Sequence, residues 1–107
     1  MIAVIFEVWT NSEHRQDYFD LAAALKPELE KIDGFISVER FASLVDEGKI
    51  LSLSFWRDEE SVKRWRTQLD HRNAQRAGRN EVFRDYRLRV ATVLRDYGMF
   101  EREQVPR

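Results

Sequence analysis

The sequence predicts an α+β domain in which four strands and two helices follow one another in the order β-α-β-β-α-β. Apolar residues recur at every second position in four short segments, a spacing typical of strands. In two longer segments they recur at every third or fourth position, as in helices with one buried face. A chain of 107 residues is expected to form one domain, with a core at 1–97 and a charged tail at 98–107.

The first strand and the first helix are predicted from the opening third of the chain. Residues 2–8 alternate between two sets that are both largely apolar, which indicates a strand. Helical spacing then continues to Ile32, and Asn11 or Ser12 is the expected N-cap. Pro27 lacks a backbone N–H, so we expect a kink there or a break just before it. Gly34 is expected to end the helix.

The remaining elements follow from turn chemistry and capping. Residues 35–43 and 50–56 predict two strands, and the turn at 46–48 favours an antiparallel hairpin. Asp58 is the expected N-cap of the second helix. Helical character continues beyond His71 but is interrupted at Gly78, and residues 86–94 predict the last strand.

This order fits a four-stranded antiparallel sheet with both helices on one face, the ferredoxin-like arrangement. The face under the helices is expected to hold ten apolar residues: Val4, Phe6, Val8, Ile36, Val38, Leu51, Leu53, Phe55, Leu88 and Val90. The opposite face would still carry Ile5, Trp9, Phe35, Phe41, Trp56 and Val93. Because a solvated face rarely carries so many large apolar side chains, we expect two sheets to pack together in a homodimer. A monomer with scattered surface aromatics is the alternative.

Composition argues against several classes of function. The formal net charge is −1, which predicts no general attraction to nucleic acid, and the third strand is aliphatic where RNA-recognition modules carry rings. There is no cysteine, which excludes disulfides, thiolate catalysis and cysteine-bound metal. No apolar run approaches the ~18 residues of a membrane span, and strand pattern begins directly after Met1. We therefore expect a cytoplasmic protein without membrane or nucleic-acid partners.

Two residues of the second helix are the main candidates for chemistry. Trp65 and His71 bring an indole and an imidazole to one amphipathic helix, in a chain with one other histidine. Packing explains Trp65 at least as well, and a solvated position near a helix end would explain His71. Glu7 is unusual as a carboxylate within an apolar strand; pairing with an arginine across the dimer would account for it.

The chain resembles the antibiotic biosynthesis monooxygenase family, whose members form dimeric α/β barrels. The resemblance extends from Met1 to about Arg95. It rests on Ile-Asp-Gly-Phe at 32–35, on Leu-Ser-Phe-Trp at 53–56 followed by Asp-Glu-Glu-Ser at 58–61, and on Trp65 followed by His71.

This resemblance implies a monooxygenase that oxidises a small phenol or quinol with molecular oxygen, without a metal or flavin cofactor. In a pocket between the helices and the sheet, His71 would act as a base or hydrogen-bond donor, and Trp65 would contact a flat ring. The substrate-binding residues would be Tyr86, Arg79, Glu7 and Phe55.

Two alternatives stay open. The same scaffold can serve a non-enzymatic protein that binds a small molecule, since one fold hosts many functions. Some relatives degrade haem, using an asparagine on the first strand together with a tryptophan and a histidine on the second helix. Glu7 stands near the position of that asparagine and Gln75 near that of the histidine, so haem degradation is the less favoured reading.

Overall fold

The computed structural model describes residues 1–75 and 83–106 and confirms the predicted order of elements. The elements are β1 (Ile2–Thr10), the short 3-10 helix η1 (Ser12–His14), α1 (Arg15–Glu30), β2 (Phe35–Ala42), β3 (Lys49–Trp56), α2 (Glu59–Gln75) and β4 (Phe83–Thr92). None of the described helices is both long enough and apolar enough to cross a membrane.

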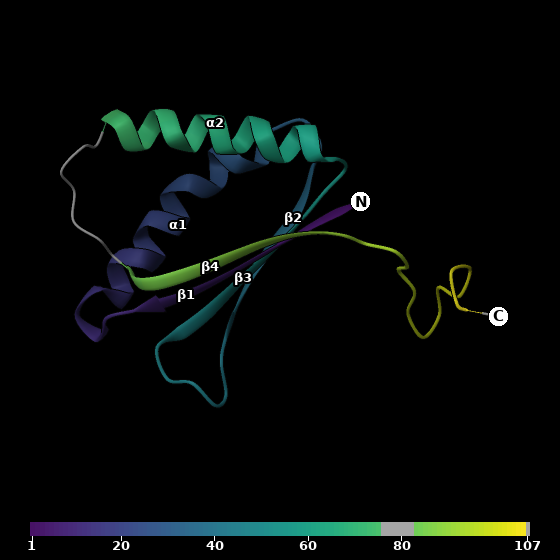
Figure 1. The fold of residues 1–107 in the computed structure, drawn as a ribbon, viewed down its shortest axis with the longest axis horizontal. Coiled ribbons are helices and arrows are strands. Elements are labelled where there is room, and N and C mark those ends of the chain that lie inside the picture. Colours follow the sequence, from purple (N-terminus) through teal and green to yellow (C-terminus); the bar gives the residue numbers. More distant parts are fainter. Residues whose placement is uncertain (76–82, 107) are drawn as a thin grey trace.

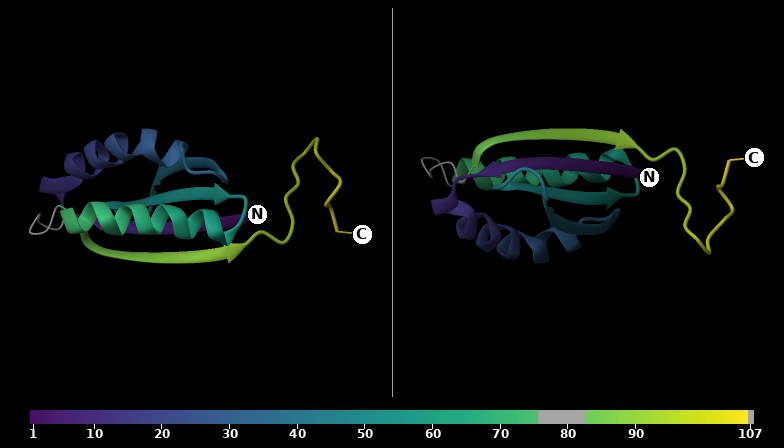
Figure 2. Two further views of the ribbon diagram at one scale, coloured as in Figure 1. Left: turned by 90° about the horizontal axis from the view of Figure 1, so that it is seen from above. Right: turned by 90° about the horizontal axis from the view of Figure 1, so that it is seen from below.

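The four strands form one antiparallel sheet in the order β2-β3-β1-β4. Both helices lie on the same side of this sheet (Figure 1). Viewed from above, β4 runs along one edge of the layer beside α2, whereas α1 lies toward the other edge (Figure 2). The result is the predicted ferredoxin-like layer, with one face covered by helices and one face free of them.

The core lies between α1 and the two central strands. Val8 and Ile50 stand opposite each other in the ladder and pack with Tyr18 of α1, while Phe6 and Phe19 lie at the border of this cluster. All three central residues are buried, so the even-numbered residues of β1 and β3 face the helices.

The predicted facing of β3 is wrong. Leu51, Leu53 and Phe55 were expected under the helices, but the ladder places them on the uncovered face together with Ile5. Ser52, Ser54 and Trp56 take the covered side instead. Both sets of β3 residues contain large apolar side chains, and alternation alone cannot tell which set the helices bury.

Trp56 explains why the helices cover its side of β3. Its side chain is almost fully buried, and its indole Nε1 donates a hydrogen bond of 2.9 Å to Ser54 Oγ. The Phe35 ring meets the indole edge-on at a centroid distance of 5.4 Å. Phe35, like Trp56, therefore belongs to the covered side rather than to the face on which both were predicted. Ile36 lines the uncovered side, because the register of β2 shifts between Phe35 and Ser37.

The first helix departs from expectation at both ends. Asn11 makes no capping hydrogen bond through its side chain, so its prediction as N-cap is wrong. Instead, His14 and Asp17 pair at 3.0 Å across the first turn. The helix does not break before Pro27 but continues to its end at Glu30. Pro27 is exposed, so its ring has solvent on its outer side.

The start of α2 is fixed as the sequence predicts. Asp58 Oδ1 accepts hydrogen bonds from Ser61 N at 2.9 Å and from Ser61 Oγ at 2.6 Å. Arg57 binds both carboxylate oxygens of Asp33 at 3.1 Å and donates its backbone N–H to the carbonyl of Gly34. Gly34 has a φ of +96°, a conformation that favours glycine. These bonds tie the end of α1 to the beginning of α2.

The chain beyond β4 leaves the body of the domain (Figure 1). Three large apolar residues on this segment are strongly exposed: Leu94, Met99 and Phe100. Its ordered contacts are local, such as the Arg102 guanidinium over the Tyr97 ring at 5.7 Å. The boundary between core and tail therefore remains a prediction.

Candidate functional site

The structure divides the predicted site residues between the two faces of the sheet. Tyr86 pairs with Val8 in the ladder and faces the helix side. Glu7 and Phe55 lie on the opposite side, because they alternate with the buried residues Val8 and Trp56. A pocket between the helices and the sheet can therefore include Tyr86 but not Glu7 or Phe55.

The helix side carries a solvent-exposed apolar strip along β4. Tyr86, Leu88 and Val90 point to this side, yet they retain 59%, 50% and 47% of their accessible surface. The Tyr86 ring lies 5.7 Å from the Phe6 ring, centroid to centroid, with a tilt of 50°. We call Tyr86, Leu88 and Val90 the β4 strip. It adjoins the aromatic border of the core and offers an apolar surface to a flat ligand.

Trp65 lies on the sheet-facing side of α2. It follows Ser61 by four residues, which places both on one helix face, and Ser61 has no exposed surface. Trp65 itself is half-buried, and α2 packs against β3. The capped start of α2 therefore directs the indole toward the covered side of the sheet, as the prediction of a ligand-contacting role requires.

His71 and Arg79 stay predictions. His71 belongs to α2, but its side chain is outside the described part of the structure. Arg79 lies outside the described residues altogether. The base and one proposed ligand of a ring oxygen therefore rest on the sequence.

Glu7 is held by two cations on the uncovered face. Its Oε2 lies 2.6 Å from Lys49 Nζ, and its Oε1 accepts a hydrogen bond from Arg89 Nη1. The hydrogen bonds from Lys49 and Arg89 lower the pKa of the Glu7 carboxyl, because they favour its ionised form. A carboxylate stabilised in this way is a weak proton acceptor. Its arginine partner belongs to the same chain, whereas the sequence predicted one across a dimer.

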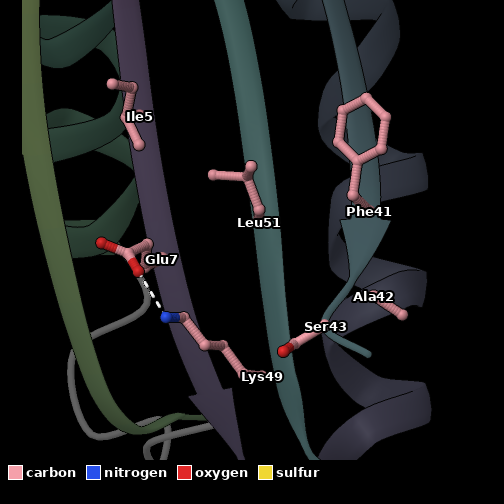
Figure 3. A pocket seen from close by; sticks show the side chains of 7 residues that line it. All are labelled: Ile5, Glu7, Phe41, Ala42, Ser43, Lys49 and Leu51. Carbon is pink, nitrogen blue, oxygen red and sulfur yellow. Dashed lines mark ion pairs between the residues drawn. The ribbon is translucent and has the colours of Figure 1, made fainter. Parts of the chain in front are cut away.

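The uncovered face also contains two shallow hollows. The first has a volume of about 420 Å³, and Figure 3 shows Glu7 and Lys49 beside the apolar side chains of Ile5, Leu51 and Phe41 that line it. Lys49 also lies 5.0 Å from the centre of the Trp9 ring, and Trp9 Nε1 donates to Asp46 Oδ2 at 2.9 Å. The second hollow has about 430 Å³ and is lined in part by Ile36, Phe55 and Val93. Both open on the face that the sequence assigns to a second sheet.

Within the described residues, no group of three or more histidine, cysteine, aspartate or glutamate side chains is placed to hold a metal ion. The acidic side chains with lowered pKa values are bound by other protein groups. Hydrogen bonding to Arg57 lowers the pKa of Asp33, and hydrogen bonds from Ser61 lower the pKa of Asp58. Both carboxylates serve the junction between α1 and α2.

Comparison with known proteins supports the resemblance seen in the sequence. The family described as antibiotic biosynthesis monooxygenase matches residues 1–77. The chain belongs to this family. That membership agrees with the strand order and with both helices covering one face of the sheet.

Two curated proteins are similar to this chain in sequence. Jasmonate monooxygenase ABM of Pyricularia oryzae is 52% identical over 93 residues, which covers 87% of this chain but 43% of the relative. The chain therefore spans less than half the length of that protein. The uncharacterised protein YqjZ of Bacillus subtilis is 29% identical over 91 residues, with 85% of this chain and 77% of YqjZ covered.

Among solved structures, the haem-degrading protein MhuD of Mycobacterium tuberculosis, with two haems in its active site, matches at a TM-score of 0.71 and 18% identity, covering 92% of this chain and all of that one. SnoaB of Streptomyces nogalater, a cofactor-independent oxygenase, matches at a TM-score of 0.70 and 13% sequence identity. The match covers 89% of this chain and 94% of SnoaB. At these identities the two structures support the fold alone.

Sequence reasoning missed two features of this domain. Leu88 and Val90 of the β4 strip were predicted as core beneath the helices, but they are half-exposed because β4 lies at the sheet edge. The cations around Glu7 were also missed. Lys49 and Arg89 each lie two positions along the neighbouring strand from the residue opposite Glu7, a relation that requires the register of three strands.

Proposed function

We propose that this chain carries a monooxygenase domain that oxidises a small, mainly apolar organic molecule with molecular oxygen and without a metal or flavin. The observation that carries the proposal is the β4 strip on the helix side of the sheet. It leaves aromatic and aliphatic surface open beside Phe6, on the same side as Trp65 of α2. Family membership supplies the reaction class.

The proposed substrate is a phenol or quinol that can lose a proton to become an electron-rich anion. This anion transfers one electron to molecular oxygen, and the resulting carbon radical and superoxide combine and take up a proton to form a hydroperoxide. Loss of water leaves a ketone, so that one oxygen atom enters the product and the other leaves as water. The protein's task is to bind, orient and deprotonate the substrate.

The roles proposed for individual residues follow from their side of the sheet. Trp65 and Tyr86 would flank the ring of the substrate, and His71 would accept its proton. Arg79 remains proposed as a ligand of a ring oxygen. Glu7 and Phe55 have no part in this helix-side pocket, since they lie on the other face of the sheet.

Jasmonate is a second candidate substrate. The observation that favours it is the 52% identity to a relative named for that activity. Jasmonate, unlike a simple phenol, carries a carboxylate. A binding site for an acid group would therefore discriminate between the two substrate classes.

We also propose that the domain forms a homodimer through the uncovered faces of its sheets. The side chains of Ile5, Leu51 and Phe41 would then be buried in the interface, and the second sheet would close both hollows. The ionic group around Glu7 would lie within the interface, and its internal pairing would limit the cost of burying it. The expected cytoplasmic location remains a prediction of the sequence.

Oxygen uptake tests the proposed reaction. The chain is mixed with a panel of hydroquinones, anthrones and jasmonate, and oxygen consumption is compared with that of heat-denatured protein. Uptake above this background, with one atom of ¹⁸O₂ incorporated per product molecule, supports a monooxygenase. Binding of a panel member without uptake would favour the non-enzymatic alternative, and a tight haemin complex with a shifted Soret band would favour the haem-binding one.

A pair of tyrosine variants locates the site. Tyr86→Ala removes a ring of the β4 strip and is expected to lower kcat/KM about tenfold or more, because aromatic contacts with a flat ligand are lost. Tyr97→Ala removes a similarly exposed ring from the C-terminal segment and should leave kcat/KM unchanged. Equal effects of the two substitutions would contradict a site at the β4 strip.

A further inference from the structure

One arginine on the helix side of the sheet has a buried donor that the protein does not use. Arg40 of β2 stands opposite Ser52 of β3, and Ser52 is opposite Phe6 of β1, which is opposite Leu88 of β4. Since residues opposite one another share a face, these four side chains form one row across the helix side. The row begins with a cation, continues with a hydroxyl group and ends with two apolar side chains.

The Arg40 Nε is buried and has no hydrogen-bond partner. Among the buried side-chain nitrogen and oxygen atoms of the described residues, it alone lacks one. A guanidinium stays charged at any ordinary pH, so burying one of its N–H groups without an acceptor destabilises the protein. Other arginines here find acceptors: Arg57 binds the Asp33 carboxylate, and Arg64 binds the Asp33 carbonyl. An unused charged donor is a feature that a bound anion would explain.

We propose that Arg40 binds the carboxylate of an organic acid whose apolar body lies along Phe6 and Leu88 toward the β4 strip. Neighbouring strands lie about 4.8 Å apart, so the row from Arg40 to Leu88 spans roughly 14 Å. This length suits a monocarboxylic acid with one or two rings or a short chain. The inference rests on the proposed function in one respect, since it places the acid group in the same helix-side site.

The surroundings of Arg40 favour a carboxylate over a phosphate. A guanidinium offers two parallel N–H donors, including Nε, that match the two oxygens of a carboxylate. A phosphate dianion would need further cations or backbone donors. The row supplies one cation, followed by Ser52 and then by apolar side chains. The substrate class is thereby narrowed to apolar molecules that carry a single acid group.

Binding of a matched ligand pair tests this inference. The probes are 1-naphthaleneacetate and its neutral amide, which share one apolar body, and affinity is measured by calorimetry at pH 7.5. The unsubstituted chain is expected to bind the acid at least tenfold more tightly than the amide, because a hydrogen bond to a charged group stabilises by about that factor. Arg40→Gln should reduce this preference to about one by weakening acid binding alone. Arg40→Lys should retain part of it.

Two controls separate a ligand-binding role from a structural one. Arg66→Gln removes an exposed arginine of α2 and should leave the preference for the acid intact. Without ligand, Arg40→Gln should melt at the same temperature as the unsubstituted chain or higher, because Arg40 Nε has no hydrogen bond to lose. Naphthaleneacetate should raise the melting temperature of the unsubstituted chain but not that of Arg40→Gln.

The outcomes distinguish this inference from the proposed reaction. The assignment of Arg40 would be overturned if the unsubstituted chain showed no preference for the acid over the amide. It would also be overturned if Arg40→Gln kept that preference. Oxidation of uncharged phenols with no effect of Arg40→Gln would also overturn it, while leaving the monooxygenase proposal standing. Acid binding that depends on Arg40, without oxygen uptake on any panel member, would support the assignment and remove the proposed reaction.

Discussion

Replacing Gly34 by alanine should destabilise this domain more than any comparable change at its other described glycines. Gly34 has a φ of +96°, and a Cβ built on it would lie 1.8 Å from Ser61 Oγ and 2.7 Å from Ser61 Cβ. Ser61 has no exposed surface and is held by Asp58, so it has little freedom to move away. The substitution therefore combines backbone strain with a collision at the start of α2.

The magnitude follows from these two contributions. A left-handed conformation costs a non-glycine residue roughly 1–2 kcal/mol, and overpacking a closed site costs about 1–3 kcal/mol. Gly34→Ala should therefore lower the free energy of unfolding by roughly 2–5 kcal/mol. In a domain of this size each kcal/mol corresponds to about 4–8 °C in Tm.

Two glycines provide matched controls for Gly34→Ala, with urea denaturation and thermal melting as the assays. Gly48 has a φ of +87°, but its added Cβ would meet only the Thr10 carbonyl oxygen at 3.4 Å, so Gly48→Ala should show the backbone contribution alone. Gly98 has no atom within 4 Å of the added Cβ, and Gly98→Ala should be close to neutral. Ser61→Gly should partly rescue Gly34→Ala. Equal destabilisation by Gly34→Ala and Gly48→Ala would refute the collision.

Three further predictions address the charges, the assembly and the base. The pKa of Asp58 is lowered by hydrogen bonds from Ser61, so its stabilising contribution is present above the ordinary value of 3.8 and is lost as the pH falls below it. Asp58→Asn should therefore lower Tm at pH 7. In thermal melts, the difference in Tm between the unsubstituted chain and this variant should shrink as the pH is lowered into the acid range. A difference in Tm that does not change with pH would contradict this prediction. Phe55→Asp places a charge on the uncovered face and should convert the proposed dimer to a monomer in light scattering, whereas Phe100→Asp on the C-terminal segment should not. His71→Ala should reduce kcat at least a hundredfold, with His14→Ala as an unaffected control, and unchanged turnover would remove His71 as the base.

Much of the fold could be predicted from the sequence because its signals are local. Alternation and helical spacing gave the order of elements, and the structure confirms it. Asp58 was recognised as the cap of α2, since capping depends on the backbone within a few residues. Gly34 was expected to stop α1, but the helix already ends at Glu30, and Gly34 lies in the turn that follows. Asn11 failed as a cap for the same kind of reason, because the short η1 intervenes before α1.

The candidate site was less accessible to sequence reasoning. Trp65 lies on the predicted helix face because helical spacing relates it to Ser61. Glu7 and Phe55 were grouped with Tyr86, and the ladder separates them. The exposure of Tyr86 depends on β4 being an edge strand, which strand order along the chain does not reveal.

The sequence by itself determined which segments are helices and strands, which family the chain resembles, and which helix carries the indole. Only the tertiary structure decided which face of β3 the helices bury, which cations hold Glu7, and that Arg40 keeps an unused donor on the helix side. The physical reason is the two-residue period of a strand. A shift of one residue exchanges its faces, and when both faces are apolar only the packing of distant elements selects between them.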